Sequence, residues 1–121
     1  MSPDAPLGAK ERASLFLVQV TRSKTVWGLR NKAGALATWA YEESKETLIP
    51  FWSGKEEARL CGEVSFPDYI AFEMSVDYFT GSVLPQLAKK GILVGVNLSE
   101  KMGGVDLPAA ALISEIQGAG K

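Results

Sequence analysis

The sequence predicts an α+β fold: a single domain with an antiparallel or mixed sheet of about five strands and helices packed mainly on one side. Three observations lead to this class. The 121 residues are the usual length of one domain. No linker-like stretch divides them, and helical periodicities are interspersed with short β-favouring stretches. The predicted order is α-β-β-β-α-(β)-α-β-β-α, in which neighbouring strands form antiparallel hairpins.

The chain begins with a segment that carries no structural pattern. Residues 1–8 contain two prolines and no hydrophobic periodicity, so we expect a flexible N-terminal arm before a single domain over residues 9–118. An apolar stripe then predicts a helix that ends near Arg22 or Ser23. Its members are Ala13, Phe16, Leu17 and Val20.

Three strands are predicted after this helix. Residues 25–41 are typical of a β-hairpin, because Asn31 suits the first position of a short turn and Gly34 can take a positive φ. Residues 47–52 predict a third strand. Proline cannot donate a hydrogen bond to a neighbouring strand, so Pro50 places this strand at a sheet edge or ends it there.

The stretch IPFWSGKEEA, residues 49–58, predicts the change from the third strand to a helix. Glu56 follows Ser53 by three residues, which is the spacing of a reciprocal capping box. We therefore expect Ser53 to be the N-cap of a short helix that runs to about Cys61.

A further strand and an interrupted helix are predicted next. Apolar side chains alternate in residues 69–74, which favours a strand, and Ser75 can cap the helix that follows. Gly81 and Pro85 lie inside this helical pattern. Because the proline ring clashes with the carbonyl four residues earlier, we expect a kink or two short helical pieces.

The C-terminal part predicts two strands and a last helix. Gly91 follows two lysines and is a strong helix stop. The continuous apolar run at residues 92–96 is typical of a strand buried on both faces. Residues 105–107 predict a short returning strand, Pro108 lies near the start of the last helix, and Gly118 ends it.

The composition argues against several chemistries. Histidine is absent, which removes the commonest general base and the Ser-His and Cys-His nucleophile pairs. Cys61 is the single cysteine, so neither an intramolecular disulfide nor a cysteine zinc cage can form, and we expect a structural thiol. The net charge of −1 provides no attraction to nucleic acid. We expect no catalytic residue, no metal ion, no cofactor and no nucleic-acid partner.

Targeting signals are also missing from the sequence. The first ten residues have no apolar core of a secretory signal, and no apolar run approaches the ~20 residues of a membrane span. We therefore expect a cytoplasmic protein without a membrane partner.

The aromatic corner before the second helix is the candidate binding site. Successive strand side chains point to opposite faces, so we expect Phe51 in the core and Trp52 facing a partner. Free N–H groups at the following helix start suit an acidic group. The alternative is that the tryptophans fill the core and that Asn97 belongs to a structural turn. The candidate binding residues are Trp27, Trp52, Ser53, Lys55 and Asn97.

Three segments together resemble a family of small bacterial proteins known as domain of unknown function 2750. They are VWGLRNKAG (26–34), LIPFWSGKEEA (48–58) and LPQLAKKGILVGVN (84–97). The resemblance covers about residues 10–117 and implies a bacterial, cytoplasmic, single-domain protein, with no activity or catalytic residue to transfer. Leu98 stands where the family has an aromatic residue, and residues 63–69 lack the family's tryptophan. The matching positions are Trp27, Gly28, Gly34, Pro50, Phe51, Trp52, Gly91, Gly95 and Asn97.

These observations favour a non-enzymatic protein-interaction domain, of the kind that neutralises or escorts a partner protein. The alternative is a small-ligand-binding or minor catalytic domain that uses carboxylate, lysine and backbone groups. Self-association through an exposed strand edge is compatible with either. A concave pocket with buried polar groups would favour ligand binding, and an exposed apolar patch would favour a protein partner.

Overall fold

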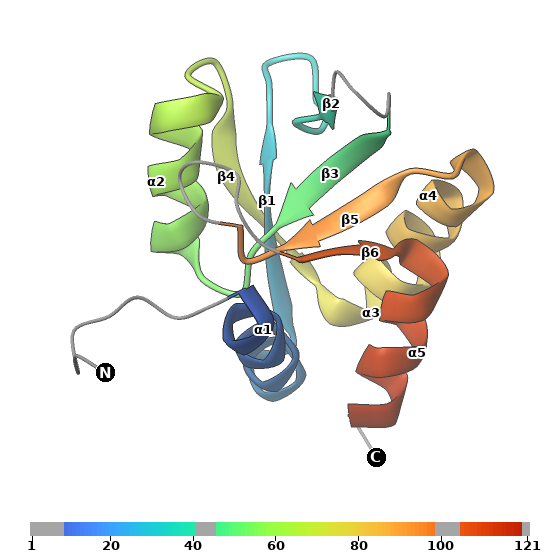
Figure 1. The fold of residues 1–121 in the computed structure, drawn as a ribbon. Coiled ribbons are helices and arrows are strands. Elements are labelled where there is room, and N and C mark those ends of the chain that lie inside the picture. Colours follow the sequence, from blue (N-terminus) through green and yellow to red (C-terminus); the bar gives the residue numbers. More distant parts are fainter. Residues whose placement is uncertain (1–8, 41–45, 99–104, 120–121) are drawn as a thin grey trace.

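The computed structural model describes residues 9–40, 46–98 and 105–119, and has the predicted α+β fold (Figure 1). The predicted arm, residues 1–8, lies outside the described residues. The order of elements also agrees with the prediction. The elements are α1 (Ala9–Ser23), β1 (Thr25–Arg30), β2 (Trp39–Ala40), β3 (Thr47–Phe51), α2 (Lys55–Ser65), β4 (Ile70–Ser75), α3 (Val76–Tyr78), the π-helix η1 (Phe79–Val83), α4 (Leu84–Lys90), β5 (Leu93–Val96), β6 (Val105–Pro108) and α5 (Ala109–Ala119).

The strands form two sheets. One has four strands in the order β2-β3-β5-β6, in which β3 and β5 are parallel and the other pairs antiparallel. The other is the antiparallel pair β1-β4. Trp27 and Trp52 join the two sheets, because each backbone N–H donates to the carbonyl of the other at 2.8 Å.

The predicted hairpin over residues 25–41 is wrong in its pairing but right in its turn. Strand β1 pairs along its whole length with β4, and contacts the segment after the turn through a bridge between Arg30 and Leu36. Within the turn, the Asn31 side chain accepts two backbone hydrogen bonds and Gly34 has a φ of +87°. Strand β4 prevails as the partner because it offers six consecutive residue pairs.

Pro50 lies in an interior strand, and not at an edge as predicted. The last residue pair between β2 and β3 is Trp39 with Leu48, so β2 has ended before the chain reaches Pro50. The backbone carbonyl of Phe51 points toward β5, where it accepts a hydrogen bond from the Asn97 N–H at 2.9 Å. Because the backbone groups of successive strand residues point to opposite sides, those of Pro50 point toward β2. Strand β2 has already ended at this position, so the lack of an N–H at Pro50 costs the sheet no hydrogen bond.

Two cores lie on opposite sides of the strands. Helices α1, α4 and α5 cover the larger core, which is built around Phe16, Phe51 and Phe79. Helix α2 lies on the other side and covers a smaller core that contains Leu29 and Trp52 (Figure 1). Most helices share one side, as predicted, and α2 is the exception that encloses the second core.

The predicted interruption of the third helical region is confirmed. The Ser75 hydroxyl accepts from the Tyr78 N–H at 3.1 Å and caps the first piece. A π-helix then replaces the regular α-helix at Phe79–Val83, and α4 follows with Pro85 in its first turn. Pro85 has no N–H for the Gly81 carbonyl, which explains the changed backbone there. Gly91 ends α4 with a φ of +68°.

Candidate functional site

Trp52 is a core residue. Its side chain is 0% exposed, and its indole N–H donates to the Leu98 carbonyl at 3.0 Å. Phe51 is also 0% exposed. The two side chains do point to opposite faces, but both faces are covered, Phe51 by the larger core and Trp52 by the core under α2. The prediction that Trp52 faces outward is therefore wrong.

Ser53 is bound to Asn97 and does not cap helix α2. The N-cap is Gly54, which makes no side-chain cap hydrogen bond. The Ser53 N–H donates to Asn97 Oδ1 at 2.8 Å, and Asn97 Nδ2 donates to the Ser53 hydroxyl at 3.0 Å. The predicted capping box does not form because Ser53 is hydrogen-bonded to the side-chain amide of Asn97, 44 residues away in sequence.

Asn97 connects three parts of the fold. It lies directly after β5 with a φ of +47° and is 7% exposed. Besides its bonds to Ser53, its amide donates to the Arg12 carbonyl of α1 at 3.2 Å. The predicted left-handed turn residue is thus also the residue that ties α1 to the corner before α2.

Trp27 and Lys55 form the surface side of the same neighbourhood. Trp27 is half-buried, and the Lys55 ammonium lies 5.9 Å from the centre of its ring. On the next turn of α2, Arg59 binds Glu56 with a distance of 2.8 Å between Nη2 and Oε2. This hydrogen bond and the positive charge of Arg59 lower the pKa of Glu56. The same hydrogen bond, with the negative charges of Glu56 and Glu63, raises the pKa of Arg59.

All five predicted binding residues therefore come together, but mostly in contacts with one another. Trp52, Ser53 and Asn97 are occupied by internal hydrogen bonds, whereas Lys55 is exposed and Trp27 half-buried. The neighbourhood is a junction between α1, β3, α2 and β5. A binding role for its surface residues stays a prediction.

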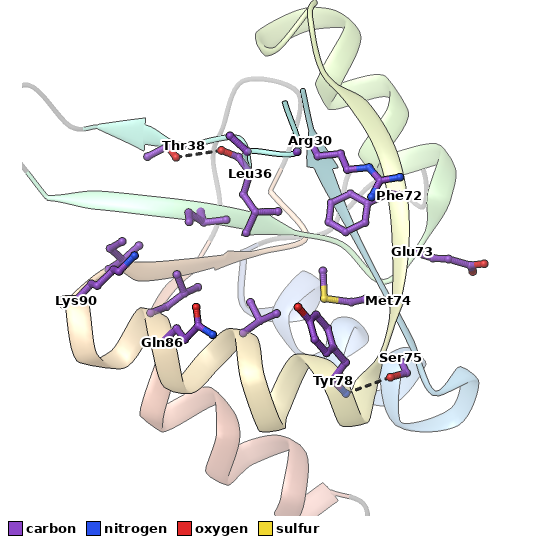
Figure 2. Close-up of a pocket in the computed structure, with 16 residues that line it drawn as sticks. Arg30, Leu36, Thr38, Phe72, Glu73, Met74, Ser75, Tyr78, Gln86 and Lys90 are labelled. Atoms are coloured by element: carbon purple, nitrogen blue, oxygen red, sulfur yellow. Dashed lines mark hydrogen bonds between the residues drawn. The ribbon is translucent and has the colours of Figure 1, made fainter. Parts of the chain in front are cut away.

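A separate cavity of about 750 Å³ lies between the β1-β4 pair and helix α4 (Figure 2). We call it the β4–α4 groove. Its floor is apolar and comes from five separate segments, and its rim carries exposed polar side chains. The floor residues include Leu36, Ile49, Phe72, Met74, Val83, Leu87 and Ile92. The rim residues include Arg30, Thr38, Tyr78, Gln86 and Lys90.

None of the five predicted binding residues lines this groove. The alternation of residues 69–74 predicts a strand, but not that β1 is its partner. The one local signal nearby is the helix interruption at Gly81 and Pro85, because Val83, at the end of the π-helix, lines the groove.

The fold and the groove define a small α+β protein. Residues 9–40, 46–98 and 105–119 contain no group of three or more potential metal ligands. In the same ranges no helix is both long and apolar enough to cross a membrane. The sequence matches the family described as "Protein of unknown function (DUF2750)" over residues 13–116, and the chain belongs to this family. No curated protein matches the sequence.

Proposed function

We propose that this protein is a non-enzymatic protein-interaction domain that binds a segment of a partner protein in the β4–α4 groove. The observation that carries the proposal is the combination of a partly open apolar floor with a polar rim that is exposed throughout. The floor side chains are buried or half-buried, and an apolar groove framed by exposed polar side chains is typical of an interaction site. A domain of this kind neutralises or escorts its partner.

The polar groups of the groove favour a chain segment over an enclosed small molecule. Small-molecule sites bury most of the ligand and place a few polar groups inside the cavity. Here Arg30, Thr38, Gln86 and Lys90 are all exposed at the rim. The one buried polar side chain among the described residues is Asn97, which does not line the groove.

The helix next to the groove adds a second argument. The π-helix η1 begins directly after Tyr78 and ends at Val83, and both of these residues line the groove. Single-turn π-helices are frequent at functional sites, because they displace side chains from their regular helical positions. Tyr78 is 57% exposed, which is unusual for a large aromatic side chain beside an apolar floor.

Small-ligand binding is the second candidate. The groove volume of about 750 Å³ lies within the range of small-molecule pockets. A small ligand that fits this groove has an apolar centre and polar groups at its edges.

Self-association is a further form of protein interaction that the fold allows. Within the described residues, β4 pairs with β1 and has no strand on its other edge. An unpaired strand edge can accept a strand from a second copy. Sedimentation over a range of concentrations tests this possibility, which a monomer at every concentration would overturn.

Selection of random peptides on the immobilised protein tests the proposed function. We expect enriched peptides whose affinity falls about tenfold or more with Tyr78→Ala, since exposed aromatic residues commonly dominate interface energies. The matched control is Val64→Ala, because Val64 is similarly exposed, at 60%, but lies on α2 outside the groove. Thermal melts establish that both variants fold. Peptides that tolerate Tyr78→Ala, or no enriched peptide at all, would overturn the groove as a protein-binding site.

A further inference from the structure

We infer that the partner segment carries an aspartate or glutamate side chain, which Arg30 binds at the rim while apolar side chains occupy the floor and Lys90 adds positive charge from the other side of the groove. This inference rests on the proposed function and specifies the chemistry of the segment. Three properties of the groove support it: the fixed position of Arg30, the unpaired state of both cations, and the orientation of the one acidic residue in its lining.

Arg30 is positioned beside the apolar floor. Its guanidinium carbon lies 4.8 Å from the centre of the Phe72 ring, and Phe72 itself lines the groove. Contact with the ring face restrains the guanidinium group and leaves its N–H edges available. A guanidinium group binds a carboxylate with two parallel hydrogen bonds, so a restrained one loses less freedom on binding.

Lys90 contributes a second positive charge from the end of α4. Figure 2 shows Arg30 and Lys90 on different sides of the cavity. The ion pairs that Arg59 forms with Glu56 and Glu63 lie outside this groove, and neither involves Arg30 or Lys90. Arg30 and Lys90 therefore have no carboxylate partner within the described parts of the chain.

Among the residues that the structure describes, the lining contains one acidic residue, Glu73, and Figure 2 shows that its side chain points away from the cavity. The described lining therefore presents the positive side chains of Arg30 and Lys90 to a ligand, although the whole chain has a net charge of −1. A positive site attracts acidic segments and disfavours basic ones. The apolar floor excludes a segment that is acidic throughout, because it would leave Leu87 and Met74 facing charged groups.

The experiment uses the peptides whose binding is lost with Tyr78→Ala. Each is synthesised with blocked termini, so that only side chains supply negative charge, and again with each acidic residue replaced by its amide. We expect the acidic form to bind about tenfold more tightly than the amide form. Arg30→Gln should weaken the acidic form by a similar factor and leave the amide form unchanged, which a double-mutant cycle measures.

Lys90→Gln should also weaken the acidic form, by a smaller factor that decreases at high salt. The control is Lys89→Gln, because Lys89 is an adjacent exposed lysine that does not line the groove. If groove-dependent peptides bind equally well as acids and as amides, or tolerate both Arg30→Gln and Lys90→Gln, the inference is wrong and the proposed function stands. If no peptide depends on Tyr78, both are wrong.

Discussion

Asn97 and Ser53 hold each other through a reciprocal pair of hydrogen bonds: the serine N–H donates to the asparagine Oδ1 at 2.8 Å, and the asparagine Nδ2 donates to the serine hydroxyl at 3.0 Å. The same amide binds the Arg12 carbonyl. One buried side chain therefore satisfies backbone groups of two elements that are distant in sequence. The stability of this junction can be measured.

Asn97→Ala should lower the free energy of unfolding by about 2 to 4 kcal/mol, because it leaves the Ser53 N–H without its acceptor and keeps a positive φ at a residue with a Cβ. Asn97→Gly removes the same side chain but relieves the backbone, so it should cost about 1 kcal/mol less. Urea denaturation measures both. Equal losses for the two variants would show that the positive φ at Asn97 stores no strain.

Ser53→Ala should cost about 1 kcal/mol or less, since the backbone bond from residue 53 to Asn97 survives. The loss concerns the hydroxyl alone, which contacts Asn97 and Gln19 and caps no helix. The matched comparison is Ser75→Ala, which removes a real N-cap and should cost about 1 kcal/mol. A loss for Ser53→Ala well above that for Ser75→Ala would contradict this assignment.

Trp52→Ala should destabilise the domain by about 3 to 5 kcal/mol, as much as Phe51→Ala, because both side chains are fully buried. A variant that retains Trp52 as its single tryptophan, with Trp27 and Trp39 replaced by phenylalanine, isolates its fluorescence. We expect an iodide quencher to leave this emission unchanged in the folded protein. Efficient quenching would place the indole at the surface and contradict the structure.

Gly95→Ala should be clearly destabilising, because an added Cβ would lie 2.6 Å from Leu98 Cδ1 and 3.2 Å from Leu48 Cδ1. Overpacking of a core typically costs about 1 to 3 kcal/mol. Gly81→Ala is the control, since nothing lies within 4 Å of the added atom. Thermal melts that rank the two variants in the opposite order would argue against the close packing around β5.

Glu56 should titrate below its usual pKa, because Arg59 donates a hydrogen bond to its carboxylate and adds a positive charge beside it. A carboxyl group with a lowered pKa in the folded state stabilises the fold above its unfolded pKa and loses that effect as the pH falls through the folded value. Both side chains are exposed, so the effect on stability should be small and weakened by salt. An NMR titration should show the pKa of Glu56 rising in Arg59→Gln; an unchanged pKa would exclude Arg59 as its cause.

Features that depend on neighbours along the chain could be predicted from the sequence. The turn at Asn31, the cap at Ser75, the interruption around Pro85 and the left-handed Gly91 all occur as expected. Each follows from a residue's own backbone preferences or from a partner within about one helical turn. The order of helices and strands was predictable for the same reason.

Features that depend on distant segments were decided by the tertiary structure. Strand alternation correctly separates Phe51 from Trp52, but only the position of α2 buries the second face and with it the tryptophan. The sequence around Ser53 fits a helix N-cap, but in the structure Ser53 binds the Asn97 side-chain amide and does not cap the helix. The β4–α4 groove exists because β1 pairs with β4 and leaves its floor open beside α4. Such outcomes depend on which distant segments release the most free energy when they pack together. The residue pattern of a single segment does not contain this information.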